Sequence, residues 1–522
     1  MGDKKIRYLL VFSLIVLNII LRIPFTPHEL GDDSFSIHLF ANSIVQNGYA
    51  KWILNPLSIV GLYPLSYPSA VPYLLSILSI ITGISMEFTI LSFSIFLGIL
   101  SVFSMYLLAK EIKDNLLFIF FSIFIFSTSP ILLSYTQWTV TTRGTLISII
   151  PLFIWGLLKF YSSHYELRYT LFSILIFLIM ITTHRAAFLS VIFIAAAISS
   201  FILLTIVKSI KLNFNQNVLS RNIIPILFFI SLIIFIYIQY ITLGFATRAQ
   251  SSILFKNVNN PILLLVNTLI HYGIKQGVLV ILIPIGLIEI LKKIKSFNML
   301  FISLSFWFLM GLMAFRTYTV ISLLSIFAIL SSLGILKILH FLDGRKIIVP
   351  AFILTSLLFS LLFSNLMIYY WTLVVEVNSK NYMSLNTFSA AIFVDKSLSE
   401  YSLMSNSDLT SRMMGTVSDN PFFIPAVEDQ FLSGFIDKND LEIERKSFSD
   451  IINGRYYGLY TLDYSKYMNI NENIIDRYGI NYYVIDKFGY SEKIHLIPIY
   501  PEIFDNKIYD SDQIGIFYHK QR

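Results

Sequence analysis

Three carboxylates stand close together in the stretch HELGDDSF at residues 28–35, those of Glu29, Asp32 and Asp33. They follow an apolar run, and carboxylates kept beside hydrocarbon are costly and usually have a function. A carboxylate beside a hydroxyl group can take its proton, so general-base chemistry is one interpretation. The alternative is structural, because Asp33 or Ser34 could cap a helix over residues 34–48. One carboxylate can cap the helix while the other acts as a base.

Arginine dominates a second group of charged residues, in loops that the span assignment below places on one membrane face. Arginine binds phosphate through a planar, bidentate fork that lysine lacks. Arginines from several loops could therefore converge on one anion, with a histidine adding a hydrogen bond. The alternative is snorkelling at helix ends, or contact with anionic lipid. The arginines on this face are Arg22, Arg143, Arg185, Arg248 and Arg316, against Lys51, Lys256 and Lys275, and the histidines are His184 and His271.

The composition of the chain indicates the class of protein that carries these residues. Of 522 residues, 56% are hydrophobic and 13% are charged, with a mean hydropathy of +0.73. Soluble domains are about 25% charged, so a single soluble globule and a disordered chain are both excluded. The net charge of +7 does not indicate nucleic acid, because residues 1–375 carry +14 and residues 376–522 carry −7. The chain has no cysteine, which excludes disulfides, thiolate nucleophiles and cysteine metal sites.

The hydrophobic pattern predicts a mainly α, polytopic membrane protein with about eleven transmembrane helices. Charged or turn residues bound each span. The spans are 6–24, 88–109, 116–134, 144–161, 169–183, 186–207, 222–242, 276–291, 297–315, 319–339 and 347–373.

The positive-inside rule orients these spans. With the N-terminus in the cytoplasm, every basic cluster of the short loops falls inside. If segment 68–83 crossed the bilayer, the later loops would change sides and their basic clusters would lie outside. We therefore expect a re-entrant or interfacial helix there. The first outer loop is then 25–87, within a transmembrane domain of residues 1–375.

Residues 376–522 are predicted to form a small extracytoplasmic α/β domain. Runs 481–486 and 514–519 are typical of short strands, and 440–452 and 471–479 are typical of helices. The chain contains no HExxH, CxxC, Gly-rich phosphate loop or GxSxG motif, so no nucleotide site is expected. The chain has no internal repeat, so a transporter built from repeats gains no support.

Four stretches resemble the GT-C superfamily of integral-membrane glycosyltransferases, which includes protein mannosyltransferases, an aminoarabinose transferase and oligosaccharyltransferases. The first is similar to the acidic first outer loop, and the second to a proline-marked helix that follows it. These stretches are GDDSFSIHLFANSIVQNGYAKW (31–52), YPLSYPSAVPYLLSILSIITG (63–83), SYTQWTVTTRGTLISIIPLFIWGLLKF (134–160) and AFRTYTVISLLSIFAILSSLG (314–334).

The resemblance implies a prokaryotic, cell-membrane glycosyltransferase that moves a hexose or pentose, with inversion, from a polyprenyl-phosphate-linked donor. The acceptor would be an extracytoplasmic protein, lipid or glycan. Asp33 is the better match for the base and Asp32 the second choice. Arg143, His184, Arg185, Arg248, His271 and Arg316 are the expected residues for the lipid phosphate and sugar.

One loop departs from the family pattern. Oligosaccharyltransferases carry a second acidic motif that helps hold a divalent metal, but here the loop reads QWTVTTRG (137–144). No cofactor is therefore expected, although Asp32 and Asp33 could share a metal with waters.

Two other functions stay open: a transporter or flippase of lipid-linked glycans, and a non-catalytic subunit of cell-envelope assembly.

Overall fold

A computed structural model gives the fold. It describes residues 3–24, 26–50, 53–54, 62–63, 68–211, 282–292, 296–313, 318–341, 363, 366–367, 370, 382–398, 403–405, 408–417, 422–423, 482–487 and 506–518. The predicted span 222–242, nearly all of the span 347–373, and the predicted helices 440–452 and 471–479 lie outside these residues. So do Arg248, His271 and Arg316.

The chain forms two compact units. The first comprises residues 1–23, 94–137 and 142–373, and the second comprises residues 24–93, 138–141 and 374–522. Helix α4 (Met86–Ile112) belongs to the second unit up to residue 93 and to the first from residue 94.

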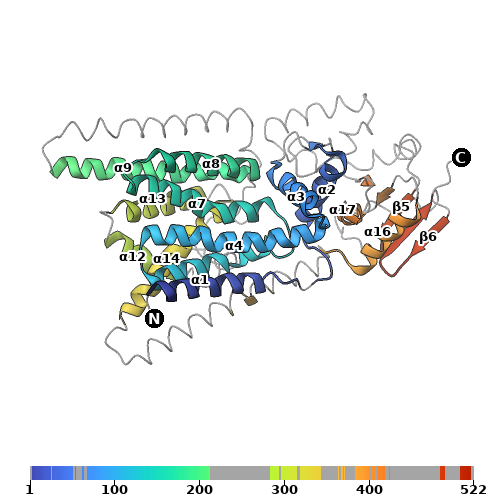
Figure 1. The fold of residues 1–522 in the computed structure, drawn as a ribbon, viewed down its shortest axis with the longest axis horizontal. Helices are drawn as coiled ribbons and strands as arrows, with labels where there is room; N and C mark the ends of the chain where they lie inside the picture. The colour runs from blue at the N-terminus through green and yellow to red at the C-terminus, as the bar shows by residue number, and fades with distance from the viewer. Residues whose placement is uncertain are drawn as a thin grey trace, which may run out of the picture. The chain divides into compact units, whose positions relative to one another are not determined.

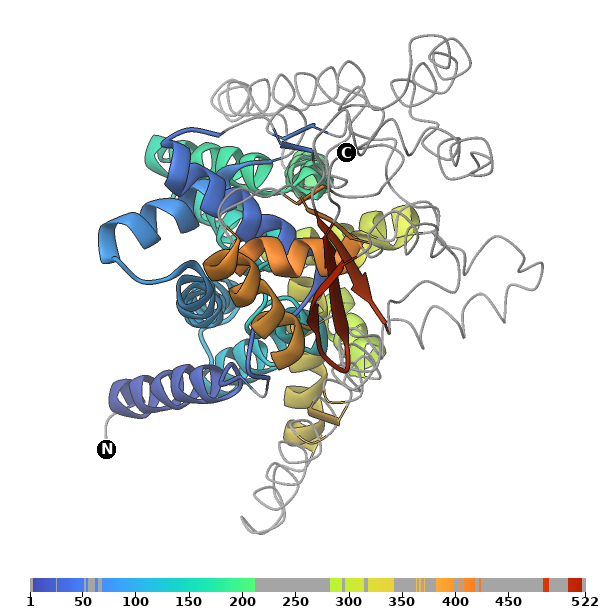
Figure 2. The same cartoon turned by 90° about the vertical axis from the view of Figure 1, so that its right-hand side faces the viewer.

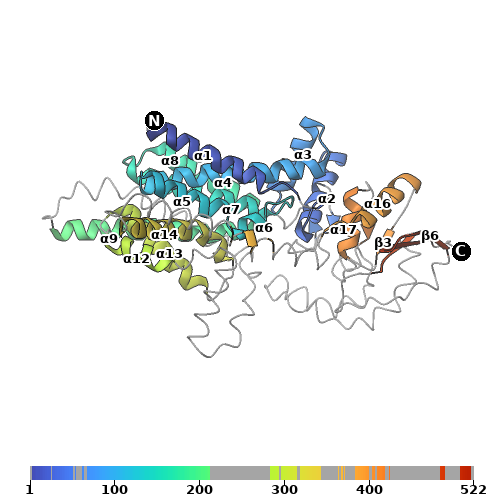
Figure 3. The ribbon, with the colours of Figure 1, turned by 90° about the horizontal axis from the view of Figure 1, so that it is seen from below.

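The described part of the first unit is helical, and its helices run side by side in Figure 1 and again in Figure 3. Its core is α14, which is buried from Thr319 to Ile335 and packs against α12, α5, α13 and α7. The helices are α1 (Asp3–Ile20), α5 (Leu116–Ser127), α6 (Pro130–Ser134), α7 (Thr142–Ser162), α8 (Leu167–Thr183), the 3-10 helix η1 (Arg185–Ser190), α9 (Val191–Lys211), α12 (Ile283–Lys292), α13 (Phe297–Met313) and α14 (Thr319–Phe341).

Four described helical segments are long and apolar enough to cross a membrane: Met86–Ile112, Thr142–Ser162, Arg185–Ile206 and Thr319–Phe341. Four shorter apolar helices accompany them, at Ala70–Thr82, Leu116–Ser127, Leu167–Thr183 and Phe297–Met310. Helix α8 exposes a stripe of leucines (Leu167, Leu171, Leu175 and Leu178), as a lipid-facing helix does. These helices are those of a membrane protein, and the full count of eleven spans stays a prediction.

The prediction of one helix over 116–134 is wrong. The segment breaks between Ser127 and Pro130 into α5 and α6. Proline lacks the N–H that an unbroken helix would need and is well placed in the first turn of a new one. Ser129 stands at the N-cap of α6.

In the second unit, α2 (Asp32–Asn47) packs against α3 (Ala70–Thr82), and β1 (Ile53–Leu54) pairs with β2 (Leu62–Tyr63). Helix α3 occupies the predicted re-entrant segment 68–83, and its relation to a membrane stays a prediction. Gly48 ends α2 in a left-handed conformation and donates its N–H to Ile44.

The C-terminal residues of this unit form a sheet with strand order β4-β3-β5-β7-β6. Strands β5 (Tyr482–Asp486) and β7 (Ile514–Tyr518) are the two predicted ones and run antiparallel, with Val484 opposite Ile516. The other elements are β3 (Leu403–Ser405), β4 (Phe422–Phe423), β6 (Asn506–Asp510), α16 (Leu385–Ser397) and α17 (Asp408–Val417). Figure 2 shows α16 and α17 in orange beside the red strands. Ala391, Val394 and Met414 of these helices form a core with Val484 and Ile516.

Candidate functional site

Asp32 and Asp33 lie in the first turn of α2, whose partial positive charge favours carboxylates there. The helix begins two residues earlier than predicted, and Gly31 occupies the N-cap position. The expectation that Asp33 or Ser34 caps this helix is therefore wrong. The carboxylates stand inside the helix, on a rigid element.

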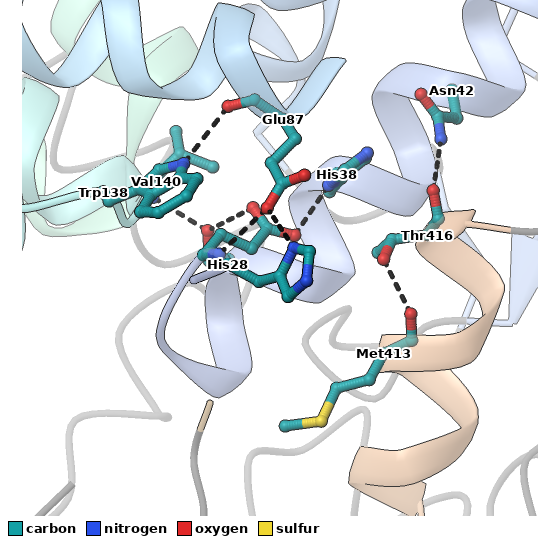
Figure 4. Close-up of polar contacts among 10 residues, drawn as sticks. His28, His38, Asn42, Glu87, Trp138, Val140, Met413 and Thr416 are labelled. Carbon is teal, nitrogen blue, oxygen red and sulfur yellow. Dashed lines mark hydrogen bonds and ion pairs between the residues drawn. The ribbon is translucent and has the colours of Figure 1, made fainter. Parts of the chain in front are cut away.

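Two histidines, which sequence reasoning did not select, bind the acids around the motif (Figure 4). His38 Nδ1 lies 2.6 Å from Glu29 Oε1, and both side chains are buried. His28 Nδ1 lies 3.0 Å from Glu87 Oε1, which also accepts the N–H of Glu29. These pairs tie α2, the preceding loop and the start of α4 together.

The loop at residues 138–141 packs directly against this motif. Val140 donates its N–H to Ser34 Oγ at 2.9 Å, and Ser34 Oγ donates to Glu29 Oε2 at 3.3 Å. Leu30 donates its N–H to the Trp138 carbonyl at 3.0 Å, and the Trp138 indole donates to the Glu87 carbonyl. Hydrogen bonds thus join the loop at residues 138–141 to the stretch that carries the acidic residues and to the start of α4.

Gly31 provides a test of this packing. Its φ is +93°, and a Cβ there would lie 2.8 Å from Thr139 Oγ1. Gly31→Ala combines backbone strain with a clash and should destabilise the protein by about 1–3 kcal/mol. Gly48→Ala is the matched control, because Gly48 also has positive φ (+72°) but nothing within 4 Å of a Cβ. We expect the thermal melting temperature in detergent to fall more for Gly31→Ala. Equal melting temperatures for the two variants would contradict the tight packing of the loops.

Asp32 has a partner from the C-terminal segment, since Arg412 Nη1 of α17 forms an ion pair with Asp32 Oδ1. No sequence pattern indicates this pair, because 380 positions separate the two residues. His28 also contacts this segment and stacks on Phe388 with 4.0 Å between ring centroids. The motif therefore contacts both α16 and α17.

In the first unit, the structure brings together three of the six residues predicted to bind an anion. The Arg143 guanidinium lies 5.5 Å from the ring centroid of Tyr135 and 5.7 Å from that of Tyr318. The His184 ring lies 5.8 Å from the Tyr318 ring. Arg143, His184 and Arg185 come from α7, the hairpin after α8, and η1, so loops distant in sequence do converge here.

The state of His184 follows from its surroundings. Burial, and then the charges of Arg143 and Arg185, hold the pKa of His184 well below its ordinary value, so the ring is neutral. Its Nδ1 accepts the N–H of Ala186 at 2.9 Å, which places the ring proton on Nε2. His184 can therefore donate one uncharged hydrogen bond, which suits an anion beside two arginines.

Arg22 has a different role from the other arginines. It is fully buried, and its guanidinium donates to Thr136 Oγ1 (2.8 and 3.1 Å) and to Asn18 Oδ1 (2.9 Å). These hydrogen bonds join α1 to the segment after α6. A buried guanidinium engaged in this way supports helix packing.

No family model matches the sequence, and no curated protein matches it. Solved structures do match. An archaeal oligosaccharyltransferase, AglB from Archaeoglobus fulgidus, in complex with an inhibitory peptide and a dolichol-phosphate, aligns at 13% identity over 93% of this chain and 70% of that chain, with a TM-score of 0.61.

ArnT from Cupriavidus metallidurans bound to undecaprenyl phosphate aligns at 10% identity over 98% of this chain and 97% of that chain, with a TM-score of 0.58. The chain has the GT-C fold. At 10–13% sequence identity, the structural similarity shows the fold alone.

The donor set of the acidic motif does not fit a divalent metal. The A. fulgidus enzyme is also known in complex with zinc and sulfate, a structure that aligns at 12% identity over 91% of this chain and 68% of that chain (TM-score 0.57). Here Glu29 and Glu87 each pair with a histidine, and Asp32 pairs with Arg412. Among the described residues, no three His, Asp or Glu side chains are grouped to hold a metal ion. Independence from cofactors stays a prediction.

Proposed function

We propose that this protein is a membrane glycosyltransferase that moves a sugar from a polyprenyl-phosphate carrier to an acceptor outside the cytoplasm. The observation that carries the proposal is the convergence of Arg143, His184 and Arg185 within a GT-C fold. The solved structures that share this fold include one with bound dolichol-phosphate and one with bound undecaprenyl phosphate. A cationic, partly buried cluster suits the phosphate that such a carrier presents.

The proposed reaction is one displacement. The acceptor hydroxyl oxygen attacks the anomeric carbon, and the bond from that carbon to the phosphate oxygen breaks. The electron pair leaves with the lipid phosphate, and Asp33 takes the hydroxyl proton. Attack on the face opposite the phosphate inverts the anomeric carbon. The leaving phosphate is already anionic, so it needs cations more than a proton, and Arg143 and Arg185 supply them.

A binding experiment tests the donor half of this proposal. Purified protein in detergent is titrated with undecaprenyl phosphate and, as the matched control, with undecaprenol, which has the same chain without the phosphate. We expect undecaprenyl phosphate alone to raise the melting temperature in a saturable manner. Equal stabilisation by the two lipids would show that the arginine cluster does not recognise phosphate.

His184 gives the lipid affinity a predicted pH dependence. A bound phosphate would favour the charged imidazolium and raise the pKa of His184 from its depressed value, against the charges of Arg143 and Arg185. Affinity for undecaprenyl phosphate should therefore rise as pH falls from 8 to 5.5. His184→Asn keeps a side-chain acceptor for the Ala186 N–H but cannot titrate. Because the lipid phosphate also titrates, with a second pKa of about 6, the prediction concerns the difference between the two proteins. Superimposable pH profiles would rule out a titrating His184 in the phosphate site.

A further inference from the structure

Arg412 of α17 binds the first turn of α2. Its side chain is 6% exposed, and its Nη1 donates both to Asp32 Oδ1 and to Ser36 Oγ, the latter at 3.2 Å. Asp32 and Ser36 are four positions apart, so they lie on the same face of the helix. One nitrogen of the guanidinium therefore bridges successive turns of the element that carries the acidic motif.

The packing around Arg412 makes this contact part of a built interface. Phe35 of α2 is fully buried in a cluster with Met383 and Met413 from the C-terminal segment. Further along, Asn42 Nδ2 donates to the Thr416 carbonyl at 3.2 Å (Figure 4). Leu30, within the acidic stretch at residues 28–35, forms an antiparallel bridge with Tyr382. The C-terminal segment thus packs along α2 on both sides of the ion pair.

The energetics favour one fixed arrangement. A buried guanidinium without a partner is unfavourable in free energy. If Arg412 broke its contacts with Asp32 and Ser36, its charge would be left buried and unpaired, so these contacts are maintained. The ion pair places the guanidinium charge of Arg412 against the Asp32 carboxylate, in the first turn of the helix that also carries Asp33.

We propose that Arg412 is a positioning residue for transfer: through its contacts with Asp32 and Ser36, α17 fixes the first turn of α2, which carries the proposed base Asp33. The inference rests on the proposed function and assigns the C-terminal segment a part in it. Arg412 acts through Asp32 and need not touch the substrate.

The experiment is a double-mutant cycle on kcat and on the KM for donor, with lipid-phosphate release from undecaprenyl-phosphate-linked hexoses and pentoses as the assay. Arg412→Gln should lower kcat by roughly 10- to 100-fold with little change in KM. Asp32→Asn should lower it similarly, and the double variant should be no worse than Asp32→Asn alone. Arg412→Lys keeps the charge and should recover most of the activity. Asn42→Ala, which removes the neighbouring contact with Thr416, is the matched control and should keep the wild-type kcat.

The outcomes separate the two proposals. Full activity of Arg412→Gln, or losses that multiply in the double variant, would overturn the role of Arg412 and leave the transferase standing. A loss in Asn42→Ala as large as that in Arg412→Gln would show a structural role alone. If Arg412→Gln does not fold, a fully inactive but folded Arg412→Lys overturns the inference. A wild-type protein that releases no lipid phosphate from any donor overturns the proposed function and this inference with it.

Discussion

Asp33→Asn should lower the rate of sugar transfer by a factor of roughly 10²–10⁴ while the affinity for undecaprenyl phosphate stays at the wild-type level. The amide has the size of the carboxylate but cannot accept the hydroxyl proton. Because Asp33 lies in the first turn of α2, the lost charge also costs the helix about 0.3–1 kcal/mol, too little to unfold it. Lipid-phosphate release gives the rate, and thermal shift gives the lipid affinity.

Asp32→Asn is the matched control for this prediction. The two residues are adjacent, and both stand in the first turn of α2. We expect the smaller loss at Asp32, because that carboxylate is paired with Arg412 and acts through position. A larger loss at Asp32 would exchange the two roles. Full transfer activity in Asp33→Asn would remove the base from the mechanism.

Arg143→Gln should weaken the binding of undecaprenyl phosphate by roughly 10- to 100-fold, as expected for the loss of a hydrogen bond from a charged donor. Arg143 lies within cation–π distance of the rings of Tyr135 and Tyr318, which favour a planar guanidinium at this position. Arg143→Lys should recover little of this affinity, because an ammonium neither stacks in this way nor forms a fork to phosphate.

Arg168→Gln is the control for the loss of a positive charge. Arg168 also lies against a tyrosine, Tyr169, but it stands in the first turn of α8, at the membrane face predicted to be cytoplasmic. Its removal should leave lipid binding unchanged. Equal losses of affinity in Arg143→Gln and Arg168→Gln would mean that binding follows net charge and that no phosphate site exists at Arg143.

Much of the membrane fold was predictable, because length and hydrophobicity dictate membrane-spanning helices. The predicted spans 88–109, 144–161 and 319–339 lie within α4, α7 and α14. The break between α5 and α6 was missed because apolar residues resume directly after it. The polar run of residues 127–129 and the proline at position 130 were the signal. The start of α2 was misplaced because Gly31 takes the cap position that Asp33 or Ser34 could also have filled.

The site was predictable in part. Chemistry and loop position selected Arg143, His184 and Arg185, and the fold brings these three together. The partners of the acids were missed for different reasons. His38 lies four positions after Ser34, a helical spacing that placed it on the motif's face and could have been noticed. Arg412 had no such signal, since only the tertiary fold brings α17 to α2.

The chain segments that make up the second unit bear on the membrane topology. It combines the first outer loop, the loop at residues 138–141 and the C-terminal residues, and the assigned spans put these three segments on one side of the membrane. Hydrogen bonds and an ion pair join these segments, as the predicted common side would allow. That the side is extracytoplasmic stays a prediction.

The most direct test follows a labelled sugar in membrane vesicles that contain wild-type protein or Asp33→Asn and are supplied with undecaprenyl-phosphate-linked hexose or pentose. The vesicles supply the native acceptor, and the variant corrects for other enzymes. We predict that wild-type vesicles move label from the donor lipid to a new product and release one undecaprenyl phosphate for each sugar transferred, while Asp33→Asn vesicles do neither. Donor lipid that crosses the bilayer intact, with no lipid phosphate released, would contradict the account and identify a flippase.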